Sequence, residues 1–301
     1  MTKLPTAMIL AFICLVAVVL FVPLPIRGRI MTSISDLLHA PLFALISACV
    51  FGFARNRISC PAINTMLICW ALVVGFGVVT ELLQPVFGRD ASAQDIWANT
   101  CGASAGILWT YASSMRPQGL RKVLVLVGCL VILFAVAKPI LTLTDTVIQR
   151  LEMPRIASFE RAGELSRWSW QECNVKRIRE HATHGSWALC VDLETGKSPL
   201  VSLDHPVVDW SQFQKLVIDV RLSNGPPLNL IVRIEDIFVG DEYPDEFHQI
   251  TRLSPGENRI DVALSDVAAG QIDLHRVWFL QLITDSPTSP RTLYFDNIQL
   301  E

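Results

Sequence analysis

Charged residues are scarce in this sequence, and those present form no basic patch. Asp, Glu, Lys and Arg make up 18% of the 301 residues, and the formal net charge is −3. A nucleic-acid-binding surface needs clustered Lys and Arg, so a nucleic-acid partner is excluded. The cysteines form no CxxC pair and show no zinc-finger spacing, which excludes a structural zinc site of that kind.

The shortage of charge belongs to the first half of the chain. Up to about residue 145, apolar segments alternate with short polar turns, whereas the rest has the composition of a soluble protein. A helix of about 20 apolar residues crosses the hydrocarbon core of a membrane. We therefore predict a membrane all-α bundle of about five transmembrane helices over residues 1–145, a linker over 146–156 and a second domain over 157–301. The apolar segments are residues 7–24, 37–53, 66–87, 96–112 and 123–143.

The first apolar segment lacks a small-x-small cleavage pattern, and further apolar segments follow it. This favours a retained membrane anchor, with a signal peptide as the alternative. Lys and Arg are more frequent in the loops that a cytoplasmic amino terminus would place inside, although Arg27 and Arg29 weaken the bias. Five crossings in this orientation place the second domain outside the cytoplasm.

Three short polar runs stand at the ends of apolar segments. They are Asp36-x-x-His39, Glu81-x-x-Gln84, and Arg89 followed by Asp95-x-x-x-Asn99-x-x-Gly102. Spacings of three and four place each pair on one face of a helix. Ionisable groups at membrane depth are costly and usually face a bundle interior or a wet cavity. We predict that the three runs share one polar pocket at the outer membrane face.

Helix capping is the alternative explanation for part of this pattern. Asp36 precedes an apolar run and Asp95 follows Ser92, so each can act as an N-cap. Glu81 falls in the last turns of its helix, where the helix dipole disfavours a carboxylate. Capping therefore explains the two aspartates but not the glutamate.

Asn99 lies one turn inside its segment, where an unpaired amide is costly. Gly102 and Gly106 on the same segment form a GxxxG surface, which suits close contact with a neighbouring helix.

The residue types in the three runs allow two kinds of chemistry. His39, the only histidine of the first half, can act as a general base beside a carboxylate. Alternatively, a divalent metal can bind the set that we also take as catalytic candidates: Asp36, His39, Glu81 and Asp95. Arg89 can grip a phosphate or a carboxylate, and we count Gln84, Arg89 and Asn99 as binding candidates. No nucleophilic serine or cysteine stands within the runs.

The order and spacing of these residues resemble the VanZ-like family of small bacterial membrane proteins, over about residues 20–112. The matching positions are Asp36, His39, Phe43, Glu81, Gln84, Arg89, Asp95, Asn99 and Gly102. Members often carry Lys after the first Asp, where this chain has Leu37. The resemblance implies the bacterial cytoplasmic (inner) membrane, a cell-envelope role and a link to resistance against the glycopeptide antibiotic teicoplanin. It implies no settled reaction.

The second domain shows short alternating runs separated by turn residues, which predict strands. The predicted strands are residues 200–203, 215–222, 228–234, 259–264, 277–283 and 293–300. Many short strands without a long helix favour an all-β jelly-roll sandwich of two sheets. Cys173 and Cys190 are the only cysteines in this domain, and we predict that they form a disulfide in an oxidising compartment.

The order of features over about 157–301 resembles galactose-binding-like jelly-roll carbohydrate-binding modules. The features are Phe159-Glu160, a His184-Gly-Ser-Trp-Ala-Leu189 run, Asp209-Trp-Ser211, Pro255-Gly-Glu-Asn258 and Tyr294-Phe-Asp-Asn-Ile298. The resemblance implies a structural Ca2+ between Glu160 and Asp296. Sugar binding needs exposed aromatic faces, for which the candidates are Trp210, Phe238, Tyr243 and Phe247, with Trp210 and Tyr243 preferred. Core packing is the alternative for each of them.

Two functions remain open. In the first, the chain is an accessory protein whose membrane half engages a membrane lipid or lipid-linked glycan and whose sandwich holds polysaccharide. It would serve envelope polysaccharide handling, lipid-linked precursor handling or glycopeptide-type resistance. In the second, it is a membrane enzyme that modifies a lipid-linked envelope precursor through the polar pocket at the outer leaflet. The pocket favours the enzyme, and the absence of a nucleophile favours the accessory protein.

Overall fold

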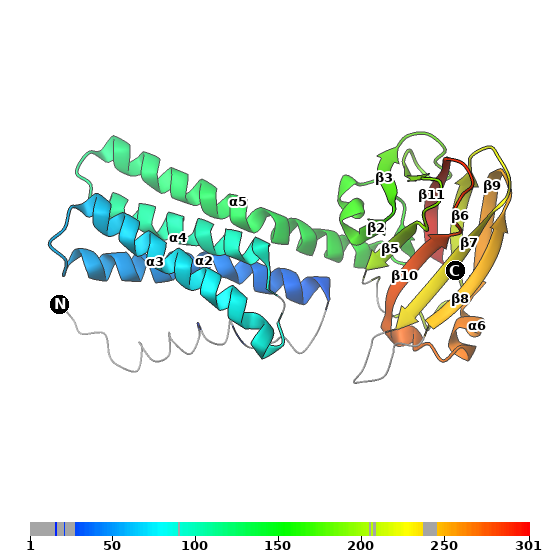
Figure 1. The fold of residues 1–301 in the computed structure, drawn as a ribbon, viewed down its shortest axis with the longest axis horizontal. Coiled ribbons are helices and arrows are strands. Elements are labelled where there is room, and N and C mark those ends of the chain that lie inside the picture. Colours follow the sequence, from blue (N-terminus) through cyan, green and yellow to red (C-terminus); the bar gives the residue numbers. More distant parts are fainter. Residues whose placement is uncertain are drawn as a thin grey trace. The chain divides into compact units, whose positions relative to one another are not determined.

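The computed structural model describes residues 16, 21, 28–89, 91–204, 206, 209–236 and 246–301. The chain divides into two compact units, Met1–Leu143 and Thr144–Glu301 (Figure 1). Apart from Val16 and Phe21, the predicted first membrane segment lies outside the described residues.

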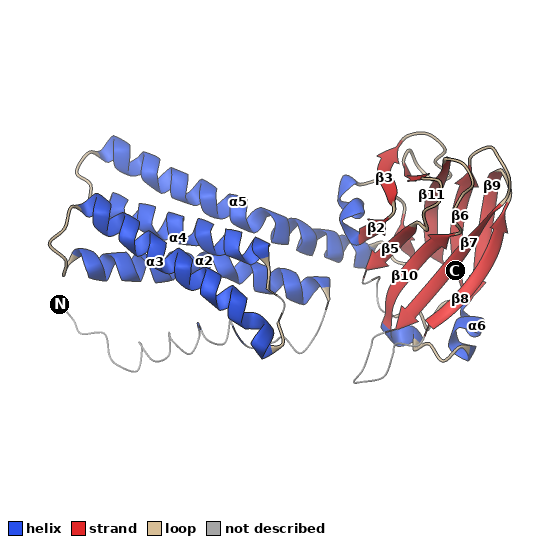
Figure 2. Cartoon of the chain, in the orientation of Figure 1, coloured by secondary structure: helices blue, strands red, loops and turns tan. Residues whose placement is uncertain are grey.

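The first unit is helical (Figure 2). It contains α2 (Arg29–Arg55), α3 (Ala62–Leu83), the short 3-10 helix η1 (Gln84–Phe87), α4 (Ala93–Ser113) and most of α5 (Gln118–Leu151). Among the described residues, three spans are long and apolar enough to cross a membrane: Arg29–Arg55, Ala62–Phe87 and Gln118–Leu151. The prediction of a helical half is therefore confirmed, whereas the number of crossings stays a prediction.

Large apolar side chains cover the outside of these helices. Among the described residues, Leu72 is 64% exposed and Phe134 is 69% exposed, and the strands of the second unit expose only Trp170 and Ile250 of this class. A soluble domain rarely leaves so much apolar surface in water, so this surface is compatible with contact with lipid.

Two helix boundaries differ from the prediction. α2 begins at Arg29, after Gly28 at its N-cap position, so Asp36 lies about two turns inside the helix and is not a cap. α5 continues to Leu151, and β1 follows at Arg155, so the predicted linker over 146–156 is largely the end of a helix. Both boundaries were predicted from apolar residues alone, but residues with good helix propensity extend a helix beyond its apolar segment.

α2 and α4 touch through their backbones, as the GxxxG surface predicted. A Cβ atom at Gly102 would lie 2.1 Å from the carbonyl oxygen of Ala40, and one at Gly106 would lie 2.0 Å from that of Ala44. On α3, a Cβ at Gly77 would lie 2.9 Å from the Phe43 ring. Missing side chains thus let three helices approach closely around the polar runs.

The second unit is a sandwich of two antiparallel sheets. The strands are β1 (Arg155–Ala157), β2 (Trp168–Gln171), β3 (Cys173–Ile178), β4 (Ala188–Leu193), β5 (Leu200–Asp204), β6 (Lys215–Leu222), β7 (Leu228–Asp236), β8 (Glu246–Leu253), β9 (Gly256–Ala263), β10 (Val277–Thr284) and β11 (Arg291–Leu300). One sheet has the order β3-β4-β11-β6-β9, with β1 also paired to β11, and the other has the order β2-β5-β10-β7-β8. The predicted two-sheet architecture is confirmed.

The inner faces of both sheets form one apolar core. Alternate residues of β6 and β7, such as Ile218, Val220, Leu230 and Val232, are fully buried. This alternation is the period of two that predicted the strands. The connecting segments η2 (Ala162–Arg167), α6 (Leu264–Ala269) and η3 (Leu274–Arg276) complete the unit.

The end of α5 belongs to the second unit and is fastened there by a buried ion pair. Arg167 donates to both carboxylate oxygens of Asp145, from Nε and from Nη2, each at 2.8 Å. Its Nη1 also donates to the carbonyl oxygen of Ile156 at 3.3 Å. Both side chains are almost inaccessible to solvent, so removal of either would take a charged hydrogen-bond partner from a buried charge.

Candidate functional site

The three helices α2, α3 and α4 bring four of the predicted polar side chains together. His39 Nδ1 lies 3.0 Å from Asn99 Oδ1 and 3.8 Å from Glu81 Oε1. His39 Nε2 lies 3.8 Å from Asp95 Oδ2. At most 5% of any of these four residues is exposed. We call His39, Glu81, Asp95 and Asn99 the polar cluster.

The turn between α3 and α4 positions the two carboxylates of the cluster. Ser92 is the N-cap of α4, and its hydroxyl accepts the backbone N–H groups of Gln94 and Asp95. In a capping box, the third helical residue reaches back to the N-cap N–H. Here Glu81 of α3 accepts the Ser92 N–H at 3.4 Å, so Asp95 turns its carboxylate toward His39 instead.

This arrangement also explains a carboxylate at the end of α3. Glu81 is disfavoured by the dipole of its own helix, but it receives N–H groups from Ser92 and from the side chain of Gln84, which donates to Oε1 at 3.0 Å. Positive partial charge at the start of α4 therefore compensates the dipole of α3.

The other predicted residues lie around the cluster. Gln84 is fully buried beside Glu81, and Arg89 Nη2 donates to Ser35 Oγ of α2 at 2.7 Å. Asp36 is half-buried on α2, and it is not part of the group of ligand atoms that lie within 4.8 Å of one another. That group consists of His39, Glu81 and Asp95.

Several buried atoms of this region have no hydrogen-bond partner among the described residues. They are His39 Nε2, Gln84 Oε1, Asp95 Oδ1 and Asn99 Nδ2. A buried polar atom without a partner costs about 1–3 kcal/mol, and native proteins contain few of them. Four in one place indicate a position for a polar ligand or an ion.

The contact with Asn99 defines the proton arrangement of His39. An amide oxygen only accepts hydrogen bonds, so the ring nitrogen opposite Asn99 Oδ1 must be the donor. His39 Nδ1 therefore carries a proton, and Nε2 is the nitrogen that faces Asp95. An imidazole oriented in this way can serve as a base or as a metal ligand through Nε2.

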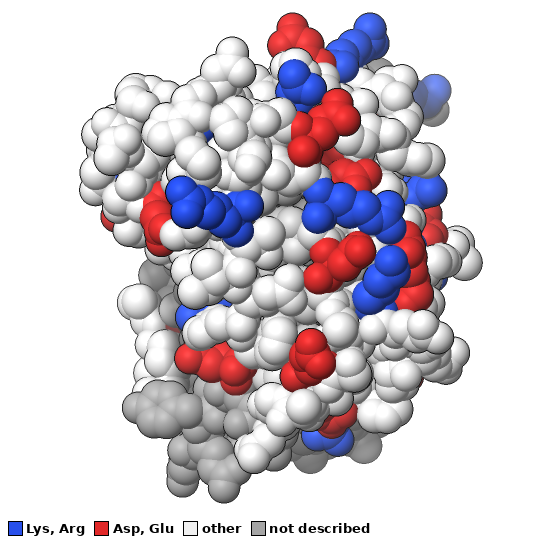
Figure 3. All heavy atoms as spheres, turned by 90° about the vertical axis from the view of Figure 1, so that its right-hand side faces the viewer, with Lys and Arg blue, Asp and Glu red and all other residues white. Residues whose placement is uncertain are grey.

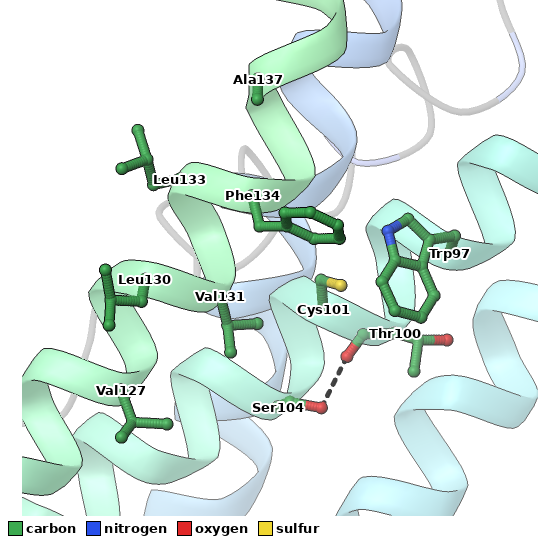
Figure 4. Close-up of a pocket in the computed structure, with 10 residues that line it drawn as sticks. All are labelled: Trp97, Thr100, Cys101, Ser104, Val127, Leu130, Val131, Leu133, Phe134 and Ala137. Carbon is green, nitrogen blue, oxygen red and sulfur yellow. Dashed lines mark hydrogen bonds between the residues drawn. The ribbon is translucent and has the colours of Figure 1, made fainter.

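An apolar groove lies between α4 and α5, on another face of α4. Its volume is about 760 Å³. Figure 4 shows Trp97 and Phe134 facing each other across it, and their ring centroids are 6.2 Å apart. Among the described residues that line it, Thr100 and Ser104 carry hydroxyl groups, and Ser104 Oγ donates to the Thr100 carbonyl at 2.8 Å. Such a groove suits a hydrocarbon chain.

In the sandwich, the prediction that Trp210 binds sugar is wrong. Trp210 is fully buried in the core, because the turn after Asp209 directs the indole inward and its backbone N–H donates to the Leu274 carbonyl at 2.8 Å. Phe247 packs against the same core. Phe238 and Tyr243 lie outside the described residues.

The predicted calcium ligands hold a loop by hydrogen bonds. Glu160 Oε1 accepts the N–H groups of Ser186 and Trp187, and Asp296 Oδ2 accepts those of Thr183 and His184. Burial raises the pKa of Asp296 despite these bonds. Asp296 Oδ1 also accepts the Asn297 N–H. Calcium takes six to eight oxygens, so the calcium site stays a prediction.

The predicted disulfide is wrong, since Cys173 and Cys190 are both free thiols. In the pairing of β3 with β4, Cys173 lies opposite Leu193, and Cys190 lies opposite Lys176. A shift of three positions along paired strands turns the two side chains to opposite faces of the sheet. Cys173 packs toward the core, and Cys190 Sγ lies 3.7 Å from Asp192 Oδ1 on the other face.

One half-buried aromatic residue on the outer face of the sandwich was missed by the sequence prediction. Tyr294 of β11 points away from the core, and its ring lies 4.4 Å, centroid to centroid, from that of His181. Its neighbours across the strands are Arg221 and Cys190. The alternation of apolar and polar residues along β11 was the available signal. Figure 3 shows Lys, Arg, Asp and Glu side chains interspersed over the sandwich surface in view, with no large area of one sign.

No protein-family model matches the chain, and neither does any curated protein. Among solved structures, similar chains include carbohydrate-binding modules. The family 11 carbohydrate-binding module from Clostridium thermocellum, in complex with a beta-1,3-1,4-mixed-linked tetrasaccharide, is 14% identical, with a TM-score of 0.40 over 48% of this chain and 93% of that chain. The family 30 module of a cellulosomal cellulase of Clostridium thermocellum is 13% identical, with a TM-score of 0.38 over 49% and 95%. An exo-beta-agarase is 13% identical, with a TM-score of 0.41 over 49% of this chain and 24% of that chain.

Proposed function

We propose that this chain is a multi-pass protein of the bacterial inner membrane that binds a lipid-linked cell-envelope precursor by its phosphate head group. In this proposal, the sandwich lies outside the cytoplasm and binds polysaccharide. The observation that carries the proposal is the polar cluster, which is buried between α2, α3 and α4 and keeps unpartnered polar atoms. Two of these helices, α2 and α3, are long and apolar enough to cross a membrane. The resemblance of the three polar runs to the VanZ-like family supports an envelope role.

A phosphate lipid has two parts, and the helical unit offers a suitable surface for each. Arg89 is joined to α2 at Ser35, one turn before His39, and a guanidinium grips phosphate oxygens well. The apolar groove between α4 and α5 suits the hydrocarbon tail. α4 contributes to both surfaces, since it carries Asp95 and Asn99 on one face and Trp97 and Cys101 on another.

Lipid binding is testable with the full chain in nanodiscs, by native mass spectrometry with a polyisoprenyl phosphate and with the matching polyisoprenol. We expect binding of the phosphate only, weakened at least about tenfold in Arg89→Gln, because a charge-assisted hydrogen bond contributes about 1.5–3 kcal/mol. Arg57→Gln, at an exposed position after α2, is the control. Equal binding of phosphate and alcohol would contradict the head-group site.

For the sandwich, the pair of half-buried Tyr294 and exposed His181 replaces Trp210 as the proposed sugar platform. Aromatic faces with polar neighbours bind the apolar faces of sugar rings. Polysaccharide binding by the full chain should be lost in Tyr294→Ala and kept in Trp170→Ala, an exposed aromatic of the other sheet. Loss in both variants or in neither would refute this platform.

The orientation predicted from Lys and Arg belongs to the same proposal. Two reporters fused after Glu301 test this orientation. One that works only outside the cytoplasm should be active, and one that works only in the cytoplasm should be inactive. Cells that express the chain should also tolerate more teicoplanin than cells that express Glu81→Gln, if the role implied by the VanZ-like resemblance holds.

A second candidate function is an enzyme that acts on the same head group. The orientation of His39 by Asn99 favours it, because an imidazole with one free nitrogen beside two carboxylates is a suitable general base. Release of inorganic phosphate from a polyisoprenyl diphosphate, abolished in His39→Gln, would select the enzyme over the accessory protein. If the chain without substitutions binds the polyisoprenyl diphosphate but releases no inorganic phosphate, the accessory protein is selected.

A further inference from the structure

Three side chains of the polar cluster have the composition of a metal site. His39, Glu81 and Asp95 come from three different helices, and one ligand atom from each lies within 4.8 Å of the others. All three side chains are buried. One imidazole and two carboxylates form a mixed nitrogen and oxygen set, which suits Zn2+ or Mn2+ better than Ca2+ or Mg2+.

The surroundings of His39 match those of a metal-ligating histidine. Such a residue almost always donates its second ring N–H to an oxygen, which fixes the tautomer and leaves the other nitrogen for the metal. Here Nδ1 donates to Asn99 Oδ1 at 3.0 Å, and Nε2 has no partner among the described residues.

The distance between His39 Nε2 and Asp95 Oδ2 also points to a bridging ion. It is 3.8 Å, which is too long for a hydrogen bond of about 2.9 Å. Two atoms that bind the same zinc ion, each at about 2.1 Å, lie at most about 4.2 Å apart. The observed separation of 3.8 Å is therefore too long for a direct hydrogen bond but fits two ligand atoms of one ion.

Charge gives a third, independent reason. His39 lies 3.8 Å from a carboxylate oxygen of Glu81 and of Asp95. The positive charge of Arg89 also acts on Glu81. Two buried carboxylates beside a neutral imidazole outnumber the one charge of Arg89, and a net negative charge is costly in a membrane interior. A divalent cation would neutralise both carboxylates and would give partners to His39 Nε2 and Asp95 Oδ1.

We propose that His39, Glu81 and Asp95 bind one divalent transition-metal cation, of the Zn2+ or Mn2+ type, with Asn99 and Gln84 as positioning residues that orient His39 and Glu81. The proposal deepens the proposed function and rests on its site. The cation supplies the positive charge that a phosphate oxygen of the lipid head group would meet at the centre of the cluster.

The test measures cation binding to the purified full chain in nanodiscs. The protein is stripped with a chelator, loaded with Zn2+ or Mn2+ and assayed by isothermal titration and elemental analysis. We expect one Zn2+ or Mn2+ per chain and at least about tenfold weaker Mg2+ and Ca2+ binding. Co2+ as a spectroscopic probe should give ligand-field bands of a site with one nitrogen and carboxylate ligands.

The near-isosteric variants His39→Gln, Glu81→Gln and Asp95→Asn should each lower the affinity by more than about tenfold, and Asn99→Ala should lower it by about 10–100-fold through the orientation of His39. His248→Gln and Glu194→Gln, which change exposed side chains of the sandwich, should leave it unchanged. Each variant must elute as a single species with wild-type helix content, which separates loss of the site from loss of the fold.

Two results would overturn the cation site: no stoichiometric binding by the folded chain, or binding that the cluster variants do not weaken. Failure of the proposed function looks different, because the chain would then bind the cation but not polyisoprenyl phosphate. Lipid binding that survives complete chelation would support the head-group site and remove the cation from it.

Discussion

The buried pair between Arg167 and Asp145 allows a quantitative test of what holds the end of α5 in the second unit. Arg167→Ala would leave the Asp145 carboxylate buried without its two hydrogen bonds of 2.8 Å, and would free the Ile156 carbonyl. Removal of one partner of a buried ion pair costs about 3–5 kcal/mol. Because a typical domain unfolds with only about 5–15 kcal/mol, this is a large share of the total.

The assay is urea unfolding of the full chain in mild detergent, followed by tryptophan fluorescence. The single variants Arg167→Ala and Asp145→Ala should each lower the free energy of unfolding by about 3–5 kcal/mol, and the double variant should cost clearly less than their sum. The exposed pair Lys176–Asp192, with a similar distance of 2.9 Å, is the matched control, and its removal should have a far smaller effect because water screens it. A cost below about 1 kcal/mol for Arg167→Ala, or strict additivity, would show that this pair does not stabilise the unit.

Three further predictions follow from the packing. Gly102→Ala should destabilise the α2–α4 contact by about 1–3 kcal/mol and lower the melting temperature in detergent. Gly75→Ala is the control, because a Cβ atom there has no neighbour within 4 Å and should not lower the melting temperature. Equal effects of the two variants would refute the close contact. Trp210→Ala should destabilise the sandwich by about 3–5 kcal/mol in urea unfolding, and a stable variant would contradict its place in the core. Burial raises the pKa of the Cys173 and Cys190 thiols to about 11, so on the order of 0.1% of each is thiolate at pH 8. Mass spectrometry should therefore find both as free thiols that a maleimide modifies slowly until the chain unfolds. A disulfide between them would refute this prediction.

The strands of the sandwich differ in how readily their sequence reveals them. β6 was predicted over its full length of residues 215–222, because Leu216, Ile218 and Val220 alternate with outward residues. β8 was missed, since its outward and inward positions are both rich in polar residues and only Leu253 is buried. A strand at the edge of a sheet buries little apolar surface against the core, so its hydrophobic pattern is weak.

The polar cluster was predictable because helical spacing and the cost of buried charge both act locally along the chain. What the sequence did not reveal is which carboxylate accepts the Ser92 N–H at the start of α4. Glu81 of α3 accepts it in place of Asp95, and the Asp95 carboxylate lies near His39 instead. That exchange depends on how two helices meet. The disulfide failed for the same reason, because strand register decides which face a cysteine occupies, and register is a tertiary property.

The state of the His39 ring tests most directly whether the polar cluster is a ligand site or only a junction between helices. The chain has six histidines, so nitrogen-15 histidine labelling, with His39→Gln for assignment, isolates the signal of interest. In chelator-treated protein in nanodiscs, we expect a protonated Nδ1 and a bare Nε2, and Zn2+ should shift the Nε2 resonance while Nδ1 keeps its proton. A proton on Nε2 that persists in the presence of Zn2+ would contradict the account and would make the cluster a hydrogen-bonded helix junction.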